Sequence, residues 1–598
     1  MNKKNIVFVI LIITLSLISY MNVFDNEFVW DDHVFILENN DIKSFANIPL
    51  FFKEDVDGLY RPLRSLHYTF AYSIFKKNPF GYHLNAVFFH TVISVLVFFI
   101  IKKIIENRNI ALVASLIFAA NPIHAERVAN MTAGFDLLGI FLFLLSFYFY
   151  ILYSKSNNEK NDKKYFIFSL LFFILALLAS EEAITLPLII ILYEFSFNKE
   201  FDKKNLKNTI NKNPLKSYLP FFAAAFFYLI LRFFILGIRG RIETYLGGNF
   251  LITQLTMLKV YVKYIVLLLF PVNLTLFQEV PVAKGLFDAG VLVSLFVLSI
   301  ILIFTIKNYR KDIVFFSVFW LFITLIPFSN IMPIQVFMAE RYLYVPSIGF
   351  SLIISFLFFK IYNIEIKNIK DKKLFKNALI ILFVLLLSFY SARTIIRNND
   401  WQDNLSLWTK TIETNPYNSR AHDNLGFTYE QLGDDEKAFL EFQKAVELMP
   451  DNFRALSNLG IAYAKKKQYN ISIGLMQKAL RINPLHYKTH DKLGLVYLEV
   501  DDAENAIKSF ERATEINPRY AKAYNDIAAA YGKIGEFEKV EENLKKAIKL
   551  DRDYADAHYN LGILYDFLGE KEKAMKEFEA AFKLEPRNEL YGKKASRK

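Results

Sequence analysis

Long apolar runs alternate with short polar connections over roughly the first 395 residues, and the last 200 or so have the pattern of polar helices. Eleven runs span or nearly span a bilayer in length, although several are short, notably 109–120 and 183–197. The eleven runs are residues 5–20, 84–104, 109–120, 134–153, 164–180, 183–197, 217–236, 287–306, 312–328, 342–360 and 375–392. The pattern predicts an all-α protein, in which a polytopic membrane bundle of about eleven transmembrane helices precedes a soluble helical domain.

Composition supports a membrane protein and argues against a nucleic-acid-binding protein and against cysteine-based chemistry. The 598 residues are 54% hydrophobic and include 61 phenylalanines, which a soluble chain of this size would not need. A net charge of +12 would also fit a nucleic-acid partner. The basic residues, however, collect in short connections between apolar runs, as membrane topology requires, so we expect no nucleic-acid partner. The chain has no cysteine, which excludes disulfides, thiol catalysis and Cys-based zinc sites.

The basic connections follow alternate apolar runs. Placing all of them in the cytoplasm gives one consistent topology, with the N-terminus inside and the C-terminus outside. We expect the run 5–20 to be an uncleaved helix, because no small-x-small cleavage site follows it; a signal peptide is the alternative. Segment 250–270 is apolar enough to span but carries Lys259 and Lys263. We interpret it as an interfacial or half-inserted helix whose lysines face headgroups or a lipid phosphate, and a twelfth span is the alternative.

The first outer loop is rich in acids. Residues 22–58 contain nine Asp or Glu residues and two lysines, and Asp31 and Asp32 are adjacent in this stretch. Arg61 and Arg64 follow. This combination suits sugar transfer from a phosphate donor, in which a carboxylate takes the proton of the acceptor hydroxyl and a guanidinium offsets charge on the leaving phosphate. The alternative is a solvated acidic loop whose acids pair with the arginines.

Further polar residues fall on the same predicted face, close to the ends of apolar runs. They are His124, Glu126, Asp136, Glu181, Glu182, Glu340 and Arg341. Carboxylates so near the hydrocarbon edge usually face a bundle interior or a cavity; a helix cap or an interfacial residue is the alternative for each. Glu340 and Arg341 also fit an ion pair between neighbouring loops. Arg341 is a candidate for holding a lipid phosphate, because guanidinium fits phosphate bidentately.

The C-terminal part repeats with a period of 34 residues. Proline recurs at positions 416, 450, 484, 518 and 586. This is the tetratricopeptide period, and it predicts five helix-pair repeats from about 419 to 586 that stack into an α-solenoid. Asn424, Asn458 and Asn560 precede a recurring leucine on the expected concave face, where an amide suits an extended peptide backbone. Ordinary repeat consensus is the alternative explanation.

A series of motifs carries a family resemblance through their order along the chain. They are FVWDDH at 28–33, YRPLRSL at 60–66, GYHLNAVFFH at 81–90, NPIHAERVANMTAGFDLL at 121–138, SEEAITLPLIIILYE at 180–194 and ERYLYVPSIGF at 340–350. Together with the repeats, this order resembles the membrane-embedded O-mannosyltransferases that carry tetratricopeptide repeats. These are distant relatives of the protein O-mannosyltransferases in the GT-C glycosyltransferase superfamily.

The resemblance implies a GT-C-like fold with its catalytic acid in the first outer loop. It also implies a polyprenyl-phosphate sugar as donor, by analogy a phosphomannose, and a Ser or Thr hydroxyl as acceptor. The motif residues of the family correspond here to Asp31 and Asp32, Arg61 and Pro62, His124 and Glu126, Asp136, and Glu340 and Arg341. Many relatives carry Lys-Glu where this chain has Glu181-Glu182, which leaves Glu182 as the closer match.

The resemblance does not decide whether Asp31 or Asp32 is the base. We favour Asp31, because it is nearer to the first span and should be better shielded from water. Repeats with candidate peptide-binding asparagines would recruit the acceptor protein. Carboxylates are plentiful enough to hold Mg or Mn, but no spaced ligand motif appears, so a metal requirement stays open.

We therefore predict a membrane-embedded glycosyltransferase domain (1–395), a linker with a partial repeat that includes Trp408 (396–418), and a repeat domain (419–598). The enzyme would be inverting, would lie in the cell membrane as a multi-pass protein, and would hold its repeats on the extracytoplasmic side. The first alternative is a non-catalytic repeat scaffold for envelope or polysaccharide assembly. The second is a lipid-sugar transporter, which predicts polar residues deep in the spans.

Overall fold

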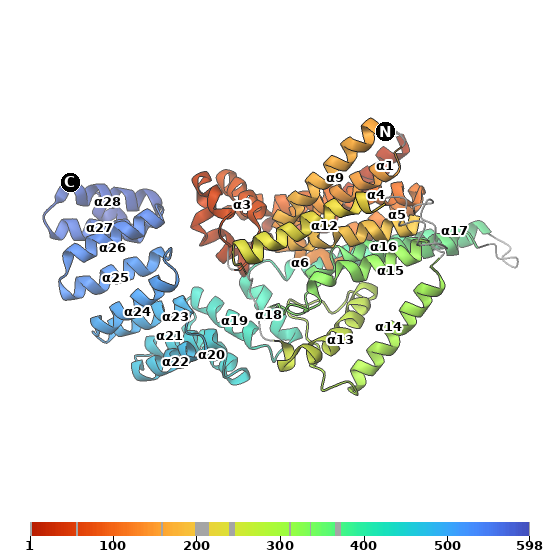
Figure 1. The fold of residues 1–598 in the computed structure, drawn as a ribbon. Coiled ribbons are helices and arrows are strands. Elements are labelled where there is room, and N and C mark those ends of the chain that lie inside the picture. The colour runs from red at the N-terminus through yellow and green to blue at the C-terminus, as the bar shows by residue number, and fades with distance from the viewer. Residues whose placement is uncertain are drawn as a thin grey trace. The chain divides into compact units, whose positions relative to one another are not determined.

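The computed structural model describes residues 3–55, 58–156, 159–197, 214–238, 245–309, 312–334, 336–364 and 372–596. It contains two compact units, Met1–Thr414 and Asn415–Lys598. The regular elements of the described residues are all helices (Figure 1), so the prediction of an all-α protein is confirmed. The boundary between the units falls within the segment 396–418 that we expected to be a linker.

Each of the eleven apolar runs coincides with a helix of the first unit. These helices are α1 (Lys3–Tyr20), α4 (Pro79–Ile105), α5 (Arg108–Ala120), α8 (Leu137–Ser154), α9 (Glu159–Ala179), α10 (Leu186–Phe197), α12 (Pro214–Ile230), α14 (Ala289–Lys307), α15 (Asp312–Thr324), α16 (Pro346–Tyr362) and α17 (Lys372–Asn399). Among the described residues, seven helices are long and apolar enough to cross a membrane, and three shorter apolar helices accompany them. A membrane helix bundle is therefore confirmed, whereas the number of spans stays a prediction.

Short helices form the predicted outer loops. They are α3 (Pro62–Phe75), η5 (Pro122–His124), α6 (Ala125–Ala129), α7 (Met131–Phe135), η6 (Glu181–Thr185) and η10 (Glu340–Leu343). Asn121, Asn130 and Ser180 start three of them, because their side-chain oxygens accept backbone N–H bonds of the first turn. Element η10 packs against η5 and α6. Residues of the 340s and the 120s are therefore neighbours.

A small hydrophobic core fixes the first loop to α7. Buried rings of Phe35, Tyr68, Tyr82 and Phe135 form this core together with aliphatic neighbours. The rings of Tyr68 and Phe135 are stacked with centroids 4.1 Å apart. Burial of such rings supplies most of the stabilisation of a loop of this kind, so the polar residues of the loop are held in place by packing.

Helix α13 (Phe250–Leu269) is continuous over 20 residues and is one of the seven helices that could cross a membrane by length and composition. The first turn of α13 and the residues after its last turn both bond to segments at the end of the bundle that carries the predicted outer loops. Gln254 Nε2 donates to the carbonyl oxygen of Ser329 at 3.2 Å, and the Val272 carbonyl accepts from Arg393 Nη2 at 2.6 Å. This arrangement favours the interfacial or half-inserted placement, which stays a prediction.

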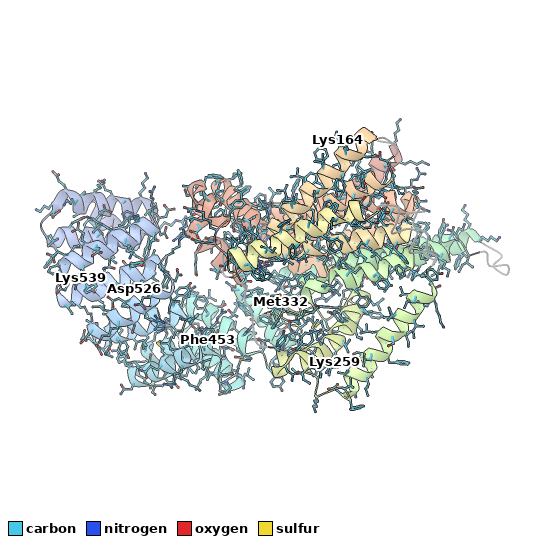
Figure 2. All side chains as sticks on the ribbon, in the orientation of Figure 1. Lys164, Lys259, Met332, Phe453, Asp526 and Lys539 are labelled. Carbon is cyan, nitrogen blue, oxygen red and sulfur yellow. The ribbon has the colours of Figure 1, made fainter. Side chains whose placement is uncertain are left out.

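The two lysines of α13 have partners within the protein, whereas we expected them to face headgroups. Lys259, labelled in Figure 2, forms an ion pair with Asp288 at 3.7 Å. Lys263 Nζ donates to the carbonyl oxygen of Glu279 at 2.7 Å. Both contacts tie α13 to the segment that leads into α14.

The second unit contains five helix pairs and a terminal helix at the predicted spacing. The helices are α19 (Ser419–Gln431), α20 (Asp435–Leu448), α21 (Phe453–Lys465), α22 (Tyr469–Ile482), α23 (Tyr487–Glu499), α24 (Ala503–Ile516), α25 (Ala521–Ile534), α26 (Phe537–Leu550), α27 (Ala555–Phe567), α28 (Lys571–Leu584) and α29 (Glu589–Ala595). Small residues permit close packing within each pair. A Cβ atom on Gly494 would lie 2.5 Å from the Phe510 ring, which is too close for any side chain.

Helix α18 (Asn404–Thr414) lies in the first unit, directly before the repeats in sequence. Trp408 on this helix is buried. Its ring contacts Trp30 of the FVWDDH motif and Phe277. The residue that suggested a partial repeat therefore packs against the first loop of the membrane unit.

Candidate functional site

The structure brings the predicted polar residues of the outer loops together at one end of the first unit. These residues are Asp32, Arg61, Arg64, His124, Glu126, Asp136, Glu182, Glu340 and Arg341. Asp31 stands between Asp32 and Trp30, whose ring lies against the Arg341 guanidinium. Their elements explain the convergence. Pro62 starts α3 directly after Arg61, and Asp136 stands between α7 and α8. Loops that are distant in sequence thus supply charges to one region.

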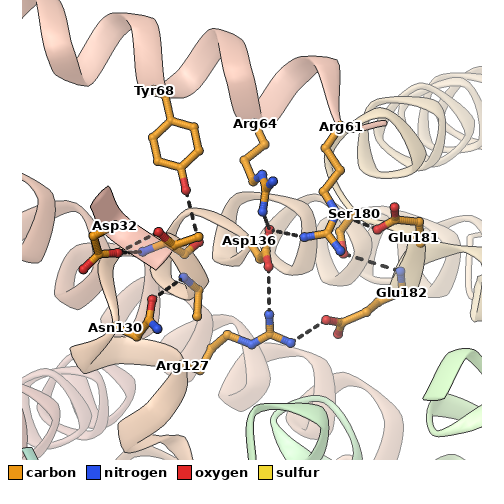
Figure 3. Close-up of polar contacts among 12 residues, drawn as sticks. Asp32, Arg61, Arg64, Tyr68, Arg127, Asn130, Asp136, Ser180, Glu181 and Glu182 are labelled. Atoms are coloured by element: carbon orange, nitrogen blue, oxygen red, sulfur yellow. Dashed lines mark hydrogen bonds and ion pairs between the residues drawn. The ribbon is translucent and has the colours of Figure 1, made fainter. Parts of the chain in front are cut away.

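Asp136 lies at the centre of a buried charge network. Its Oδ1 accepts from Arg61 Nη1 at 2.7 Å and from Arg64 Nη1 at 3.1 Å. Its Oδ2 accepts from Arg127 Nη1 at 3.2 Å (Figure 3). Three guanidinium groups thus surround one carboxylate, and the Asp136 side chain is only 10% exposed.

Glu181 and Glu182 pair with two of these arginines, Arg61 and Arg127, and Glu181 also pairs with a further one, Arg232. Glu181 accepts from Arg61 Nε at 2.6 Å and from Arg232 Nη1 at 3.1 Å, and Glu182 accepts from Arg127 Nη2. Burial favours the neutral form of Glu181, but Arg61 and Arg232 outweigh it and lower the pKa of this carboxyl. Burial raises the pKa of Glu182, with Arg127 opposing. Both glutamates therefore belong to the network, not Glu182 alone.

A second charged pair joins Glu126 to Arg341. Buried Glu126 accepts from the Arg341 backbone N–H at 2.9 Å and also from its guanidinium Nη1. The guanidinium carbon lies 6.0 Å from the Trp30 ring centre, a cation–π distance. Burial alone would lower the pKa of Arg341, but Glu126 raises it above the usual range and nearby Asp31 adds to this effect.

Asp31 and Asp32 differ sharply in environment. Asp32 is fully buried, and its Oδ1 accepts from the backbone N–H and the hydroxyl of Thr132 at 2.8 and 2.6 Å. Its Oδ2 accepts from the Val29 N–H at 3.1 Å. Burial raises the pKa of Asp32 to about 7, although these hydrogen bonds oppose the shift. Asp31 is only partly buried, so our reason for favouring it, better shielding from water, is wrong.

His124 and Glu340 lie in the packed wall of the site. His124 is fully buried, its Nε2 lies 2.8 Å from the Ser347 hydroxyl, and burial holds its pKa well below the usual range. Glu340 does not pair with Arg341. It accepts from Gln278 Nε2 at 3.2 Å and from Arg397 at 3.3 Å, and burial raises its pKa to about 7. These contacts fasten the segment after α13 to the end of α17.

Sequence reasoning missed two arginines of the network. Arg127 directly follows Glu126 in a motif that we quoted, and its position between the apolar runs 109–120 and 134–153 was a usable signal. Arg232 lies within the apolar run 217–236, where a charged residue is costly and usually functional. Part of the outer segment 237–249, residues 239–244, lies outside the described residues.

The asparagines of the repeats bond to other residues of the repeats. Asn424 Nδ2 donates to the carbonyl of its own helix at 2.8 Å. Asn458 donates to Asp423 at 2.7 Å, and Asn560 donates to Asn525 at 2.8 Å. Asn458 and Asn560 therefore link neighbouring repeats, Asn424 bonds within its own helix, and all three are partly exposed.

The described residues contain no group of three or more His, Asp or Glu side chains arranged to hold a metal ion. Arginine side chains take the places next to Asp136, Glu181 and Glu182. The charge of these carboxylates is therefore offset by guanidinium groups.

The fold and site define a helical membrane protein with a buried charge network at one end, followed by a repeat array. Comparisons with known proteins agree with this class. Residues 62–211 match the family model described as dolichyl-phosphate-mannose-protein mannosyltransferase. Tetratricopeptide repeat models match residues 426–467, 454–483, 487–520, 534–566 and 555–588.

Individual relatives of this chain are also protein O-mannosyl-transferases. The chain is 26% identical to protein O-mannosyl-transferase TMTC3 of Homo sapiens over 483 residues, which cover 74% of this chain and 51% of the relative. It is 26% identical to protein O-mannosyl-transferase F38B6.6 of Caenorhabditis elegans over 442 residues, or 70% of this chain and 59% of that one. The resemblance to membrane O-mannosyltransferases with tetratricopeptide repeats is thus confirmed. The chain spans about half the length of the curated relatives it matches.

Among solved structures, the repeat protein YrrB, described as having an unusual peptide-binding site, covers 31% of this chain and 96% of its own. The identity is 24% and the TM-score is 0.24. The repeat architecture itself follows from the five helix pairs and the matching repeat models.

Proposed function

We propose that the protein is an integral membrane glycosyltransferase that transfers mannose from a polyprenyl phosphate to Ser or Thr hydroxyls of proteins. Transfer takes place on the outer face of the cell membrane, with the N-terminus in the cytoplasm and the repeats on the extracytoplasmic side. One observation carries the proposal. The guanidinium of Arg341 lies against the ring of Trp30, the residue before partly exposed Asp31, and the Arg341 carbonyl accepts from Arg127 Nη2 of the arginine network at 3.1 Å. The mannosyltransferase names of the relatives support the choice of sugar.

In the proposed reaction Asp31 is the base. Its carboxylate takes the proton of the acceptor hydroxyl while the hydroxyl oxygen bonds to the anomeric carbon. The bond from that carbon to the phosphate oxygen breaks, and the phosphate leaves with the electron pair as an anion. Because attack comes from the face opposite the phosphate, the configuration is inverted. Asp32, held by Thr132 and Val29, fixes the loop that carries Asp31.

Arginine residues supply the charge that the leaving phosphate needs. Glu126 engages one edge of the Arg341 guanidinium, and this group carries further N–H donors in a fork that fits phosphate. The network beyond it contains four arginines, Arg61, Arg64, Arg127 and Arg232, and three carboxylates. The excess of positive charge favours an anionic ligand.

A divalent cation, Mg or Mn, is a further candidate for the donor phosphate, with Asp31 as the partly exposed carboxylate of the first loop. Treatment with EDTA followed by back-titration of each ion measures this requirement directly. Loss and ion-specific recovery of transfer support a metal, and unchanged transfer contradicts it.

The repeats recruit the acceptor protein in this proposal. Deleting residues 419–598 should spare transfer to short peptides and cripple transfer to proteins, because short peptides need only the membrane site. Equal loss on both acceptors would contradict the recruiting role.

A non-catalytic scaffold for envelope or polysaccharide assembly is the competing function. A scaffold tolerates Asp31→Asn and Asp32→Asn, whereas the transferase does not. The test of the proposal is transfer in vitro from a defined polyprenyl-phosphate mannose to candidate proteins, with the modified residue mapped by mass spectrometry. Mannose on Ser or Thr supports it, and transfer of another sugar or none contradicts it.

A further inference from the structure

Trp30 has an unusual backbone conformation directly before Asp31. Its φ angle is +51°, a left-handed value that is rare for bulky residues with a Cβ atom. Such conformations persist only where the surrounding structure fixes them, and they cluster at functional sites. Because the dihedrals of Trp30 set the direction in which the chain continues, they also set where the Asp31 side chain points.

Asn404, the first residue of α18, bonds on both sides of the acidic pair. Its Oδ1 accepts from the Trp30 N–H at 2.9 Å, and its Nδ2 lies 3.3 Å from His33 Nε2. One side chain therefore bridges the stretch that contains Asp31 and Asp32. A separate backbone bond, from Glu27 N to Gln402 O at 2.8 Å, joins the same two segments just outside this stretch.

Trp408, one turn after Asn404, supports the Trp30 side chain. Its ring meets the Trp30 ring edge-on at 6.1 Å and stacks on Phe277 at 6.3 Å, and it is 1% exposed. The Trp30 ring also meets the Phe277 ring edge-on at 6.0 Å and lies under the guanidinium of Arg341. Backbone and side chain of Trp30 are thus both held by α18, which lies outside every segment matched by the family models.

We propose that Asn404 is a positioning residue that holds Trp30 in its left-handed conformation and so fixes the direction in which the Asp31 carboxylate points. Trp408 fixes the ring of Trp30 in the same arrangement. This inference rests on the proposed function, because it assigns Asp31 the role of base. Asn404 acts only through Trp30 and His33 and need not touch substrate.

The test uses the full-length chain in detergent or nanodiscs and compares Asn404→Ala with Lys410→Ala. Lys410 lies on the exposed face of the same helix, where it pairs with Glu413. For Asn404→Ala we expect kcat to fall at least about tenfold, with KM for donor and acceptor within about twofold and an unchanged midpoint of thermal unfolding. Lys410→Ala should leave kcat, both KM values and the midpoint of thermal unfolding unchanged. A role in folding alone would lower the midpoint and spare kcat.

A double-variant cycle tests the mechanism itself. Glycine takes a positive φ without a steric penalty, so a chain with Trp30→Gly should need Asn404 less. Adding Asn404→Ala to Trp30→Gly should then lower kcat by a smaller factor than Asn404→Ala does in the wild type. Equal factors in both backgrounds would overturn the proposal.

Hydrogen exchange of the peptide that covers residues 28–33 gives a readout that does not depend on transferase activity. The amides of Asp32 and His33 bond locally to Val29 and Trp30, and Asn404→Ala should accelerate their exchange while Lys410→Ala does not. Wild-type exchange or wild-type kcat in Asn404→Ala overturns the inference. If the wild type transfers no sugar, the proposed function fails, and the exchange result alone decides whether Asn404 positions the loop.

Discussion

The two units of the chain use charge in opposite ways. In the membrane unit, Asp136 is 10% exposed and shared by three arginines from two segments, Arg61 and Arg64 at the start of α3 and Arg127 in α6. In the repeats, pairs such as Arg512–Glu515 join neighbours on one helix and are 48% and 62% exposed. Exposed pairs of this kind contribute little to stability, whereas a buried network is costly to break. Buried ion pairs therefore build the candidate site of the membrane unit, whereas pairs such as Arg512–Glu515 lie on the solvent-exposed surface of the repeats.

The largest effect is expected at the centre of the network. Asp136→Ala would leave Arg61, Arg64 and Arg127 without their shared partner in a buried site. Removing one member of a buried ionic group costs about 3–5 kcal/mol, so the midpoint of thermal unfolding in detergent should fall markedly and transfer should be lost. An unchanged midpoint would mean that the network is open to water, as the repeat pairs are.

A medium effect is expected from packing in the repeats. Gly494→Ala would place a Cβ 2.5 Å from the Phe510 ring, and such overpacking costs about 1–3 kcal/mol. Gly474→Ala is the matched control, because no atom lies within 4 Å of its Cβ position. Chemical unfolding followed by circular dichroism should show a lower midpoint for the first variant and an equal or higher one for the second.

A smaller, pH-dependent effect is expected at Asp491, a buried acid of the repeats. Burial raises its pKa to about 6, with Lys522 opposing. The folded state therefore binds the proton more tightly than the unfolded state, so the free energy of unfolding should fall as pH rises from about 4 to about 6. Asp491→Asn should flatten that part of the curve of stability against pH. An equal slope in both proteins would assign the pH dependence to other groups.

The smallest effect is expected for exposed charges of the repeats. Arg512→Ala removes a surface pair and should leave the unfolding midpoint unchanged within error. A fall as large as that of Asp136→Ala would remove the distinction between the two units.

Much of the architecture was predictable from the sequence because it follows from short-range periodicity. The apolar runs gave the membrane helices, and the 34-residue interval gave the five helix pairs. Motif order also brought together residues such as Arg61 and Asp136. The pairing of residues within the site was harder to predict from the sequence, because it depends on tertiary contacts. Asp32 is buried by Thr132, which lies 100 residues away, and no local pattern distinguishes it from Asp31. Asn404 likewise reaches Trp30 across more than 370 residues.

Asp31 is the proposed base of the mannosyl transfer. The most direct measurement compares transfer from polyprenyl-phosphate mannose by the wild type, Asp31→Asn and Asp25→Asn. Asp25 is an exposed acid of the same loop and serves as the control. We predict mannose on Ser or Thr with the wild type and Asp25→Asn, and a rate at least about a hundredfold lower for Asp31→Asn. A wild-type rate for Asp31→Asn would contradict the account.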